Sequence, residues 1–254
     1  MVLSRILLRN SHRLIKQQFL LTRKSHVITR NSSEACENTF DFVGNWPLAE
    51  KELFLQDMII QPDFITPHEE DEIMKEIDPY LKRLKYEFDH WDDAIQGFRE
   101  TERQKWYPDN KKILNRVLET AFPQESVLPH VHVLDLAEDG HIKPHVDSVR
   151  YCGTTISGIS LLSDAVMRLV RIDEKEYKDN AEYRNQPSPL GEKGFYVDVL
   201  LKRRSLYIMS YTSRYNFTHE VLGNEKSVFK GSPVKKTRRV SIICRNEPRS
   251  QTNS

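Results

Sequence analysis

The chain changes character at the stretch HVHVLDLAEDGHIKPHVD, residues 130–147, and this change decides the fold class. From here on, short apolar segments alternate with glycine, proline, asparagine or charged turns. The predicted strands are residues 131–136, 155–162, 167–172, 195–201, 206–209 and 240–243. Many short strands with turn residues between them are typical of a β-sandwich or barrel. We therefore expect a mainly β fold with flanking helices (α+β) and a jelly-roll core, the double-stranded β-helix.

Two helices are expected before these strands. The segment TPHE, residues 66–69, has the order of a helix start, with a threonine N-cap, proline in the first turn and glutamate three residues after the cap. Apolar residues follow at helical spacing and predict a face that packs on the sheet: Ile73, Ile77, Tyr80, Leu81 and Leu84. A second helix is expected over residues 110–121, ending before Pro123.

The opening stretch ends in a pair of polar residues, His145 and Asp147, and His219 follows later in the segment NFTHE. Residues two apart on an extended chain share a face, so the side chains of His145 and Asp147 can converge on one ion. Two imidazoles and one carboxylate are the ligands that hold non-haem Fe(II) on a single face with open positions. The set predicts an oxygenase.

Other histidines compete for this role. His130 and His132 also share one face of a predicted strand, but the sequence shows no carboxylate or arginine partner in register with them. We therefore interpret this pair as structural. His90 and His141 are interpreted as loop or surface histidines.

The segment RVSIICR, residues 239–245, predicts a strand with Arg239, Ser241 and Arg245 on one face. An arginine inside a barrel requires an anion, since an unpaired buried charge is unfavourable by several kcal/mol. The planar guanidinium binds a carboxylate through two parallel hydrogen bonds, which suits the far end of a 2-oxo diacid co-substrate. The basic run KKTRR, residues 235–239, is interpreted as a solvated face that delivers Arg239 rather than as a nucleic-acid patch.

The His-x-Asp pair, the later histidine and the two arginines resemble the AlkB family of Fe(II)/2-oxoglutarate dioxygenases. Longer matching strings point to a mitochondrial branch: YEFDHWD (86–92), GFRETE (97–102), HVLDL (132–136), IKPHVD (142–147) and RYNFTHE (214–220). The resemblance covers residues 55–247. It implies that His145, Asp147 and His219 bind the iron, with 2-oxoglutarate and dioxygen as co-substrates. It further implies co-substrate contacts: Arg239 at the far carboxylate, Arg245 near the metal-bound end, and Tyr207 and Ser241 through their hydroxyl groups.

The chain departs from the family at two positions. Members that repair DNA and RNA carry Asn-x-Tyr on the strand before His-x-Asp, and Leu134 and Leu136 stand there in this chain. Two polar co-substrate contacts are therefore missing, and Tyr207 is a candidate replacement. The long basic loops that grip nucleotides in those members are also not evident.

The resemblance therefore implies hydroxylation of a protein or another target that is not a nucleic acid. It also implies roles in fatty-acid metabolism and in programmed necrosis after alkylation damage. Two alternatives remain open. One is an oxidative demethylase of N-methylated bases in mitochondrial RNA, so nucleic acid is possible as a partner but not favoured. The other is a regulatory binding module that keeps the fold and acts through partner proteins.

The N-terminal segment has a composition of its own. Residues 1–33 contain seven Lys and Arg side chains and no acidic ones, with apolar residues between them. An arginine-rich, acid-poor, amphipathic leader is typical of a mitochondrial transit peptide. Without it the net charge changes from +1 to −6, which disfavours general attraction to nucleic acid. We expect the mature chain to reside in the mitochondrial matrix.

The 254 residues suit one sizeable domain plus a leader. We expect the dioxygenase domain to span residues 50–247, with an inserted loop at 173–194 and a disordered tail at 248–254. The three cysteines are far apart and form no metal-binding spacing, which favours a reducing compartment. No apolar run approaches the roughly 18 to 20 residues of a membrane span.

Overall fold

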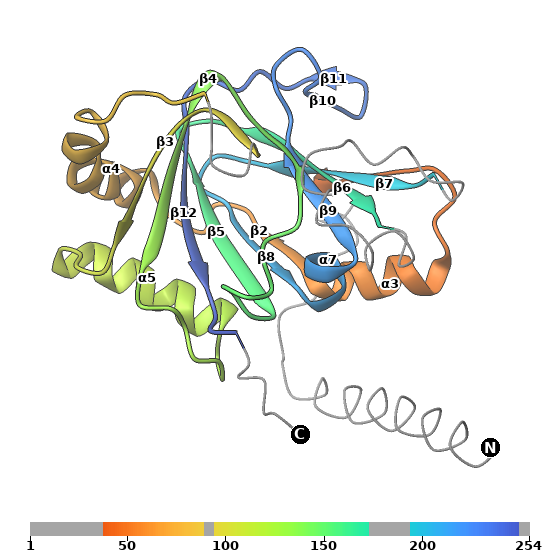
Figure 1. The fold of residues 1–254 in the computed structure, drawn as a ribbon, viewed down its shortest axis with the longest axis horizontal. Helices are drawn as coiled ribbons and strands as arrows, with labels where there is room; N and C mark the ends of the chain where they lie inside the picture. The colour runs from red at the N-terminus through yellow and green to blue at the C-terminus, as the bar shows by residue number, and fades with distance from the viewer. Residues whose placement is uncertain (1–37, 89–93, 173–193, 249–254) are drawn as a thin grey trace. The chain divides into compact units, whose positions relative to one another are not determined.

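The computed structural model describes residues 38–88, 94–172 and 194–248 (Figure 1). The expected leader at 1–33 lies outside these residues, as do nearly all of the expected insertion at 173–194 and of the tail at 248–254. His90 is outside them too. The described helices and strands belong to one unit, Glu37–Ser254.

Most of the described elements are strands. They are β1 (Phe40–Val43), β2 (Met58–Gln61), β3 (Ile95–Arg103), β4 (Val131–His145), β5 (Thr155–Leu161), β6 (Ala165–Arg171), β7 (Tyr196–Leu201), β8 (Leu206–Ser210), β9 (Phe217–Val221), β10 (Val228–Phe229), β11 (Ser232–Pro233) and β12 (Arg239–Arg245). The helices are α3 (Leu48–Asp57), α4 (Pro67–Leu81), α5 (Pro108–Ala121) and α7 (Tyr211–Tyr215). Each pairing between these strands is antiparallel.

One long strand, β4, joins the two halves of the main sheet. The strand order is β1-β7-β6-β9-β4-β12-β5-β8-β2, and β3 also pairs with β4. The first part of β4 pairs with β12 over residues 132–136, and its last part pairs with β9 at residues 142 and 145. In Figure 1 the strands β3, β4, β12 and β5 lie side by side, with β6, β7 and β9 beyond them. This is the curled antiparallel sheet of a jelly roll, so the expected mainly β fold is confirmed.

The helix predicted from its start signal is α4. Thr66 is its N-cap: the Thr66 hydroxyl accepts a hydrogen bond from the Glu69 amide, and the Glu69 carboxylate accepts one from the Thr66 amide. This reciprocal cap satisfies two donors that a helix start otherwise leaves open. Ile73, Ile77 and Leu81 are buried, whereas Tyr80 and Leu84 are exposed. The prediction of a buried apolar face was wrong for those last two: Leu84 follows the end of the helix, and the Tyr80 ring lies at the surface against the Arg103 guanidinium.

The second predicted helix is α5, whose buried face includes Ile113, Leu114 and Val117. It packs against α4 and reaches β5. The sheet itself begins at Phe40, before the expected domain start at residue 50, because β1 pairs with β7 along the edge of the sheet. The helices α4 and α5 thus lie along the half of the sheet with β3 and β5, while β1 extends the other half.

An aromatic cluster fixes β9, the strand that carries His219. The Phe217 ring contacts the Phe54 ring edge-on at 5.1 Å between centroids and stacks on Trp46 at 5.6 Å. Phe54 belongs to α3, and Phe54 and Phe217 are both fully buried. Large buried aromatic side chains dominate packing energy, so this cluster anchors β9 two residues before the histidine.

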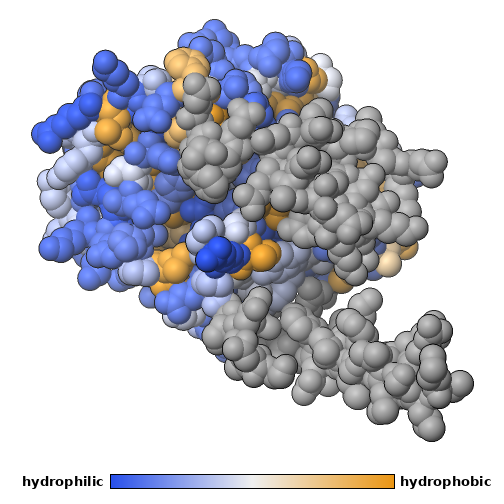
Figure 2. All heavy atoms as spheres, viewed as in Figure 1, coloured by the Kyte–Doolittle hydropathy of each residue, from blue (hydrophilic) through white to orange (hydrophobic). Residues whose placement is uncertain are grey.

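On the face shown in Figure 2 the described surface is mostly hydrophilic, with small separate hydrophobic areas. None of the helices in the described part of the chain combines the length and the apolar character needed to cross a bilayer.

Candidate metal centre

Two histidines face each other across neighbouring strands. His145 is the last residue of β4, and the strand register places it directly opposite His219 of β9. Their ring centroids lie 4.2 Å apart. Asp147 lies two residues after the end of β4. Its carboxylate points back toward the two rings. The fold therefore brings His219 to a pair of side chains that lie more than seventy positions earlier in the sequence.

The donor atoms of these side chains converge. The Asp147 Oδ1 atom lies 3.3 Å from the His145 Nε2 atom and 3.6 Å from the His219 Nε2 atom. A first-row metal roughly 2.1 Å from each ligand separates neighbouring ligand atoms by about 3 Å, so the spacing suits one ion. Within the described residues, this is the one group of three His, Cys, Asp or Glu side chains arranged so.

The hydrogen bonds around His145 favour a cation between the rings and the carboxylate. The His145 Nδ1 atom lies 2.9 Å from the Lys143 carbonyl oxygen, which can only accept, so Nδ1 donates. In the neutral ring the Nε2 atom then presents a lone pair to the Asp147 carboxylate. Two acceptors facing each other repel unless a proton or a metal ion lies between them, so the geometry fits a metal ion when the ring is neutral. A second contact that fixes the tautomer of a ligating histidine is the usual arrangement in metal sites.

His219 is suited to binding metal in its neutral form. Burial, and then the neighbouring His145, hold the pKa of His219 well below its ordinary value. Its Nδ1 atom is buried and finds no hydrogen-bond partner in the part of the chain that the structure describes. A neutral ring offers the Nε2 lone pair to an ion without first losing a proton.

Asp147 is held as a carboxylate by its surroundings. Burial alone would raise the pKa of Asp147, but the Arg245 guanidinium outweighs it, joined by His145 and His219 when their rings carry a proton, and this pKa stays well below its usual range. The Arg245 Nε–H donates to the Asp147 Oδ2 atom at 2.9 Å. Arg245 thus occupies one carboxylate oxygen and leaves Oδ1 toward the histidines.

A row of side chains lines the same face of β4, β12, β5 and β8. Residues directly opposite each other in antiparallel strands point to the same face. By this register Ser241 lies between Leu134 and Ser160, and Tyr207 lies opposite Gly158. Arg239 and Arg245 share this face with Ser241, as the alternation along the strand predicted. The predicted co-substrate residues therefore line one surface.

Arg239 is a buried cation that pairs with no carboxylate in the part of the chain that the structure describes. Its Nε–H donates to the Ser160 hydroxyl at 3.0 Å, and none of the described acidic side chains forms an ion pair with it. Burial lowers the pKa of Arg239. A guanidinium taken out of water in this way is unfavourable unless an anion binds it.

Tyr207 lies close to both arginines and to Asp147. Burial raises the pKa of Tyr207, so its hydroxyl stays protonated and can donate a hydrogen bond at neutral pH. Gly158 makes room for it: a Cβ atom there would lie 2.5 Å from the Tyr207 ring and 2.6 Å from its hydroxyl oxygen. Leu134 and Leu136, which lie in the same row, are both buried.

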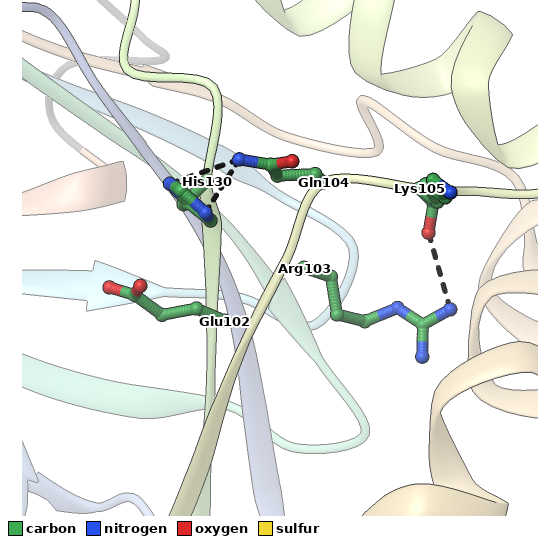
Figure 3. A pocket seen from close by; sticks show the side chains of 5 residues that line it. All are labelled: Glu102, Arg103, Gln104, Lys105 and His130. Atoms are coloured by element: carbon green, nitrogen blue, oxygen red, sulfur yellow. Dashed lines mark hydrogen bonds between the residues drawn. The ribbon is translucent and has the colours of Figure 1, made fainter.

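The rival pair, His130 and His132, does not converge. The His130 ring contacts the Gln104 amide at 2.6 Å and lines a shallow polar pocket where β3 ends (Figure 3). His132 instead lies between the Glu100 carboxylate and the Arg245 guanidinium. The expectation that this pair has no carboxylate or arginine partner was therefore wrong for His132. Both partners lie on the strands next to β4, β3 and β12, which are far from His132 in the sequence.

The basic run at 235–239 is a solvated face only in part: Lys235 and Thr237 are exposed, but the other residues are not. Lys236 is fully buried, and its ammonium group donates to the backbone carbonyls of Ala137 and Glu138. Burial lowers the pKa of Lys236 to about 8. Arg238 forms ion pairs with Asp78 and Asp135. The charges of Lys236 and Arg238 are therefore satisfied by contacts within the fold.

Several residues near the centre were not identified from the sequence. The Arg214 guanidinium is fully buried and donates to the Cys152 sulfur at 3.1 Å, while its Nε and Nη1 atoms find no partner among the described residues. Cys152 in turn lies 4.0 Å from the Asp147 Oδ2 atom. Gly158 could have been recognised, since a glycine inside a strand often marks a close approach. Arg214 and Cys152 carry no such signal.

Comparison with known proteins decides the family. The chain is 44% identical over 196 residues to "Alpha-ketoglutarate-dependent dioxygenase alkB homolog 7, mitochondrial" of Bos taurus, covering 76% of this chain and 80% of that protein. The Mus musculus protein of the same description is 45% identical over 191 residues, covering 75% and 78%. The chain belongs to the AlkB family. Its members named here use alpha-ketoglutarate, which is 2-oxoglutarate.

Two further comparisons add less. No family model matches the chain. A solved structure described as OsALKBH1 covers 75% of this chain and 98% of that one, at 12% identity and a TM-score of 0.49.

As the two mammalian relatives show the family, the chain is an Fe(II)- and 2-oxoglutarate-dependent dioxygenase, and the predicted cofactors are confirmed.

The contact between Gly158 and Tyr207 gives a first prediction. Gly158→Ala places a methyl group where the Tyr207 ring lies, so the ring must move. Loss of one hydrogen bond from Tyr207, about 0.5–1.5 kcal/mol, should raise the KM for 2-oxoglutarate roughly two- to tenfold. Steady-state succinate formation measures this. Tyr207→Phe should raise KM equally, and an unchanged KM in both variants would remove Tyr207 from the co-substrate site.

Proposed function

We propose that His145, Asp147 and His219 bind Fe(II) and that the chain hydroxylates a protein, or another target that is not a nucleic acid, in the mitochondrial matrix. The observation that carries the ligand assignment is the convergence of two Nε2 atoms and one carboxylate oxygen. Bound Fe(II) and 2-oxoglutarate supply the oxidising chemistry: 2-oxoglutarate loses carbon dioxide and becomes succinate as dioxygen is consumed, and a substrate C–H bond is hydroxylated.

The remaining residues bind and orient the co-substrate. Arg239 binds the far carboxylate of 2-oxoglutarate with its guanidinium, which has no carboxylate of its own among the described residues. Ser241 contacts the same region from the next inward position of β12. Tyr207 donates its hydroxyl in place of the polar residues that Leu134 and Leu136 replace. Arg245 keeps the Asp147 carboxylate turned toward the metal and faces the metal-bound end of the co-substrate.

The choice of a protein target rather than RNA rests on charge and on the lining of the site. The chain without residues 1–33 is acidic overall, and Lys236 and Arg238 of the basic run 235–239 are occupied by internal contacts. Strong binding to nucleic acid needs several free Lys and Arg contacts to phosphate. The roles in fatty-acid metabolism and in programmed necrosis after alkylation damage belong to the same proposal, with the family resemblance as their support.

The location in the matrix is also part of the proposal, as is a dioxygenase domain at 50–247 that β1 (Phe40–Val43) extends toward the N-terminus. Their support is the arginine-rich, acid-free composition of residues 1–33 and the mitochondrial naming of both relatives. Import with removal of the leader follows from that composition.

Succinate formation tests the substrate class. The purified protein, supplied with Fe(II) and 2-oxoglutarate, is assayed with mitochondrial protein-derived peptides and, separately, with methylated RNA oligonucleotides. Peptides should stimulate succinate formation and gain oxygen by mass spectrometry, while RNA should leave the basal rate unchanged. Stimulation by RNA together with formaldehyde release would instead establish the demethylase. A chain inactive with 2-oxoglutarate under all conditions would favour the regulatory module.

A further inference from the structure

A chain of polar contacts runs from Asp147 away from the metal centre to the surface. Arg245 donates from Nε to Asp147, and its Nη1 atom lies 3.2 Å from the His132 Nδ1 atom. The His132 Nε2 atom lies 2.7 Å from the Glu100 Oε2 atom. These residues belong to β12, β4 and β3, which lie side by side in Figure 1. The contacts continue in one line across three strands.

The strand register explains why these side chains meet. Ile243 of β12 lies opposite His132, and Arg245 is two residues further along the same face. On the other side Glu102 of β3 lies opposite His132, and Glu100 is two residues along. Arg245 and Glu100 are thus diagonal neighbours of His132 on either side, a separation that long side chains span.

The direction of each hydrogen bond is fixed by chemistry. Arginine has no acceptor atom, so Arg245 donates and the His132 Nδ1 atom accepts. In the neutral ring the Nε2 atom then carries the proton and donates to the Glu100 carboxylate. One neutral tautomer of His132 satisfies both neighbours. Each side chain therefore holds the next in a single orientation.

We propose that His132 and Glu100 are positioning residues that hold Arg245 against Asp147 and so preset the metal-binding carboxylate. This inference rests on the proposed ligand role of Asp147. A long arginine side chain loses considerable conformational freedom when it is fixed, and a second anchor reduces that loss when metal binds. Partners behind metal ligands commonly change metal affinity by about 10- to 100-fold. His132 exerts this effect through Arg245.

The competing explanation is that His132 and Glu100 only tie β3 to β4. The Glu100 side chain is 34% exposed and that of His132 15%, as expected for a contact near a sheet edge. A purely structural contact would change the unfolding temperature and leave metal affinity as it was. Metal affinity in the folded protein is therefore the deciding measurement.

The test uses the full chain and titrates it with Mn(II), a redox-stable substitute for Fe(II), by calorimetry without turnover. His132→Leu should weaken Mn(II) binding by about tenfold. His132→Asn places an amide oxygen near the position of Nδ1, keeps the acceptor for Arg245 and should restore most of the affinity. Glu100→Leu, a change at a partly exposed position, should weaken binding several-fold and provides a variant that folds if His132→Leu does not.

Two controls separate the possible failures. His130→Leu, two residues earlier, removes a histidine that contacts Gln104 in the pocket of Figure 3 and should leave Mn(II) affinity at the parental value. Asp147→Ala should abolish Mn(II) binding. If Asp147→Ala does so while His132→Leu and Glu100→Leu bind as the parent, the positioning role is wrong and the proposed function stands. Parental Mn(II) binding by Asp147→Ala would overturn the ligand assignment itself.

Discussion

Asp147→Ala should lower succinate formation by more than about 100-fold, since changes behind a metal ligand already reduce activity by about 10- to 100-fold. Asp147 supplies the one anionic donor of the group, and its pKa is held low by Arg245 against the effect of burial. Two neutral histidines alone neither balance the charge of the ion nor complete one face of its coordination. Metal content after dialysis and the rate of succinate formation measure the loss.

Asp147→Asn separates charge from shape. The amide has nearly the size of the carboxylate and its oxygen can still accept from Arg245, but it carries no charge for the metal. This variant should fold as the parent does and still lose most of the activity. Ser148→Ala, the neighbouring change, should leave both metal content and rate unchanged. Succinate formation by Asp147→Ala at the parental rate would show that the ligands lie elsewhere.

Much of the fold could be predicted because local patterns agree with the final structure. The Thr66 cap predicted the start of α4, and the alternation in residues 239–245 predicted the face that Arg239 and Arg245 share. The three candidate ligands were identified by residue type and order. Their meeting follows from one pairing, that of His145 with His219, which no local pattern specifies.

Residues whose partners lie far away in sequence were predicted poorly. The strand β3 contains Arg99, Glu100 and Glu102 and lacks the apolar alternation of a half-buried strand, so it was missed. Its polar side chains are satisfied by distant residues: Arg99, for example, donates to Asp135 at 2.8 Å. Lys236 was misplaced on the surface for the same reason. A single sequence does not show which charged side chains will form ion pairs or hydrogen bonds with each other in the fold.

Arg239→Met should raise the KM for 2-oxoglutarate by about 10- to 100-fold, because a hydrogen-bonded charged contact contributes about 1.5–3 kcal/mol and each 1.4 kcal/mol is tenfold. The turnover rate at saturating 2-oxoglutarate should fall much less, since this contact also exists before reaction. Arg239→Lys retains the charge but not the fork that binds both carboxylate oxygens, so its KM should be intermediate. Initial-rate kinetics over a wide range of 2-oxoglutarate measure all three.

The same change should not harm the folded chain in the absence of ligand. Arg239 is 2% exposed and has Ser160 rather than a carboxylate as its partner, so its charge opposes folding until the co-substrate binds. Thermal unfolding of Arg239→Met without 2-oxoglutarate should therefore occur at the parental temperature or above. Added 2-oxoglutarate should stabilise the parent and leave the variant unchanged.

The adjacent residue provides the matched control. Arg238 directly precedes β12 and forms ion pairs with Asp78 and with Asp135, whose side chain is fully buried. Arg238→Met removes one ion-pair partner of the buried Asp135 carboxylate, so it should lower the unfolding temperature. It should leave the KM for 2-oxoglutarate unaltered. Two neighbouring arginines should thus show opposite effects on stability and on co-substrate binding. A parental KM in Arg239→Met, or a strongly destabilised ligand-free protein, would mean that Arg239 supports the fold and does not bind the co-substrate.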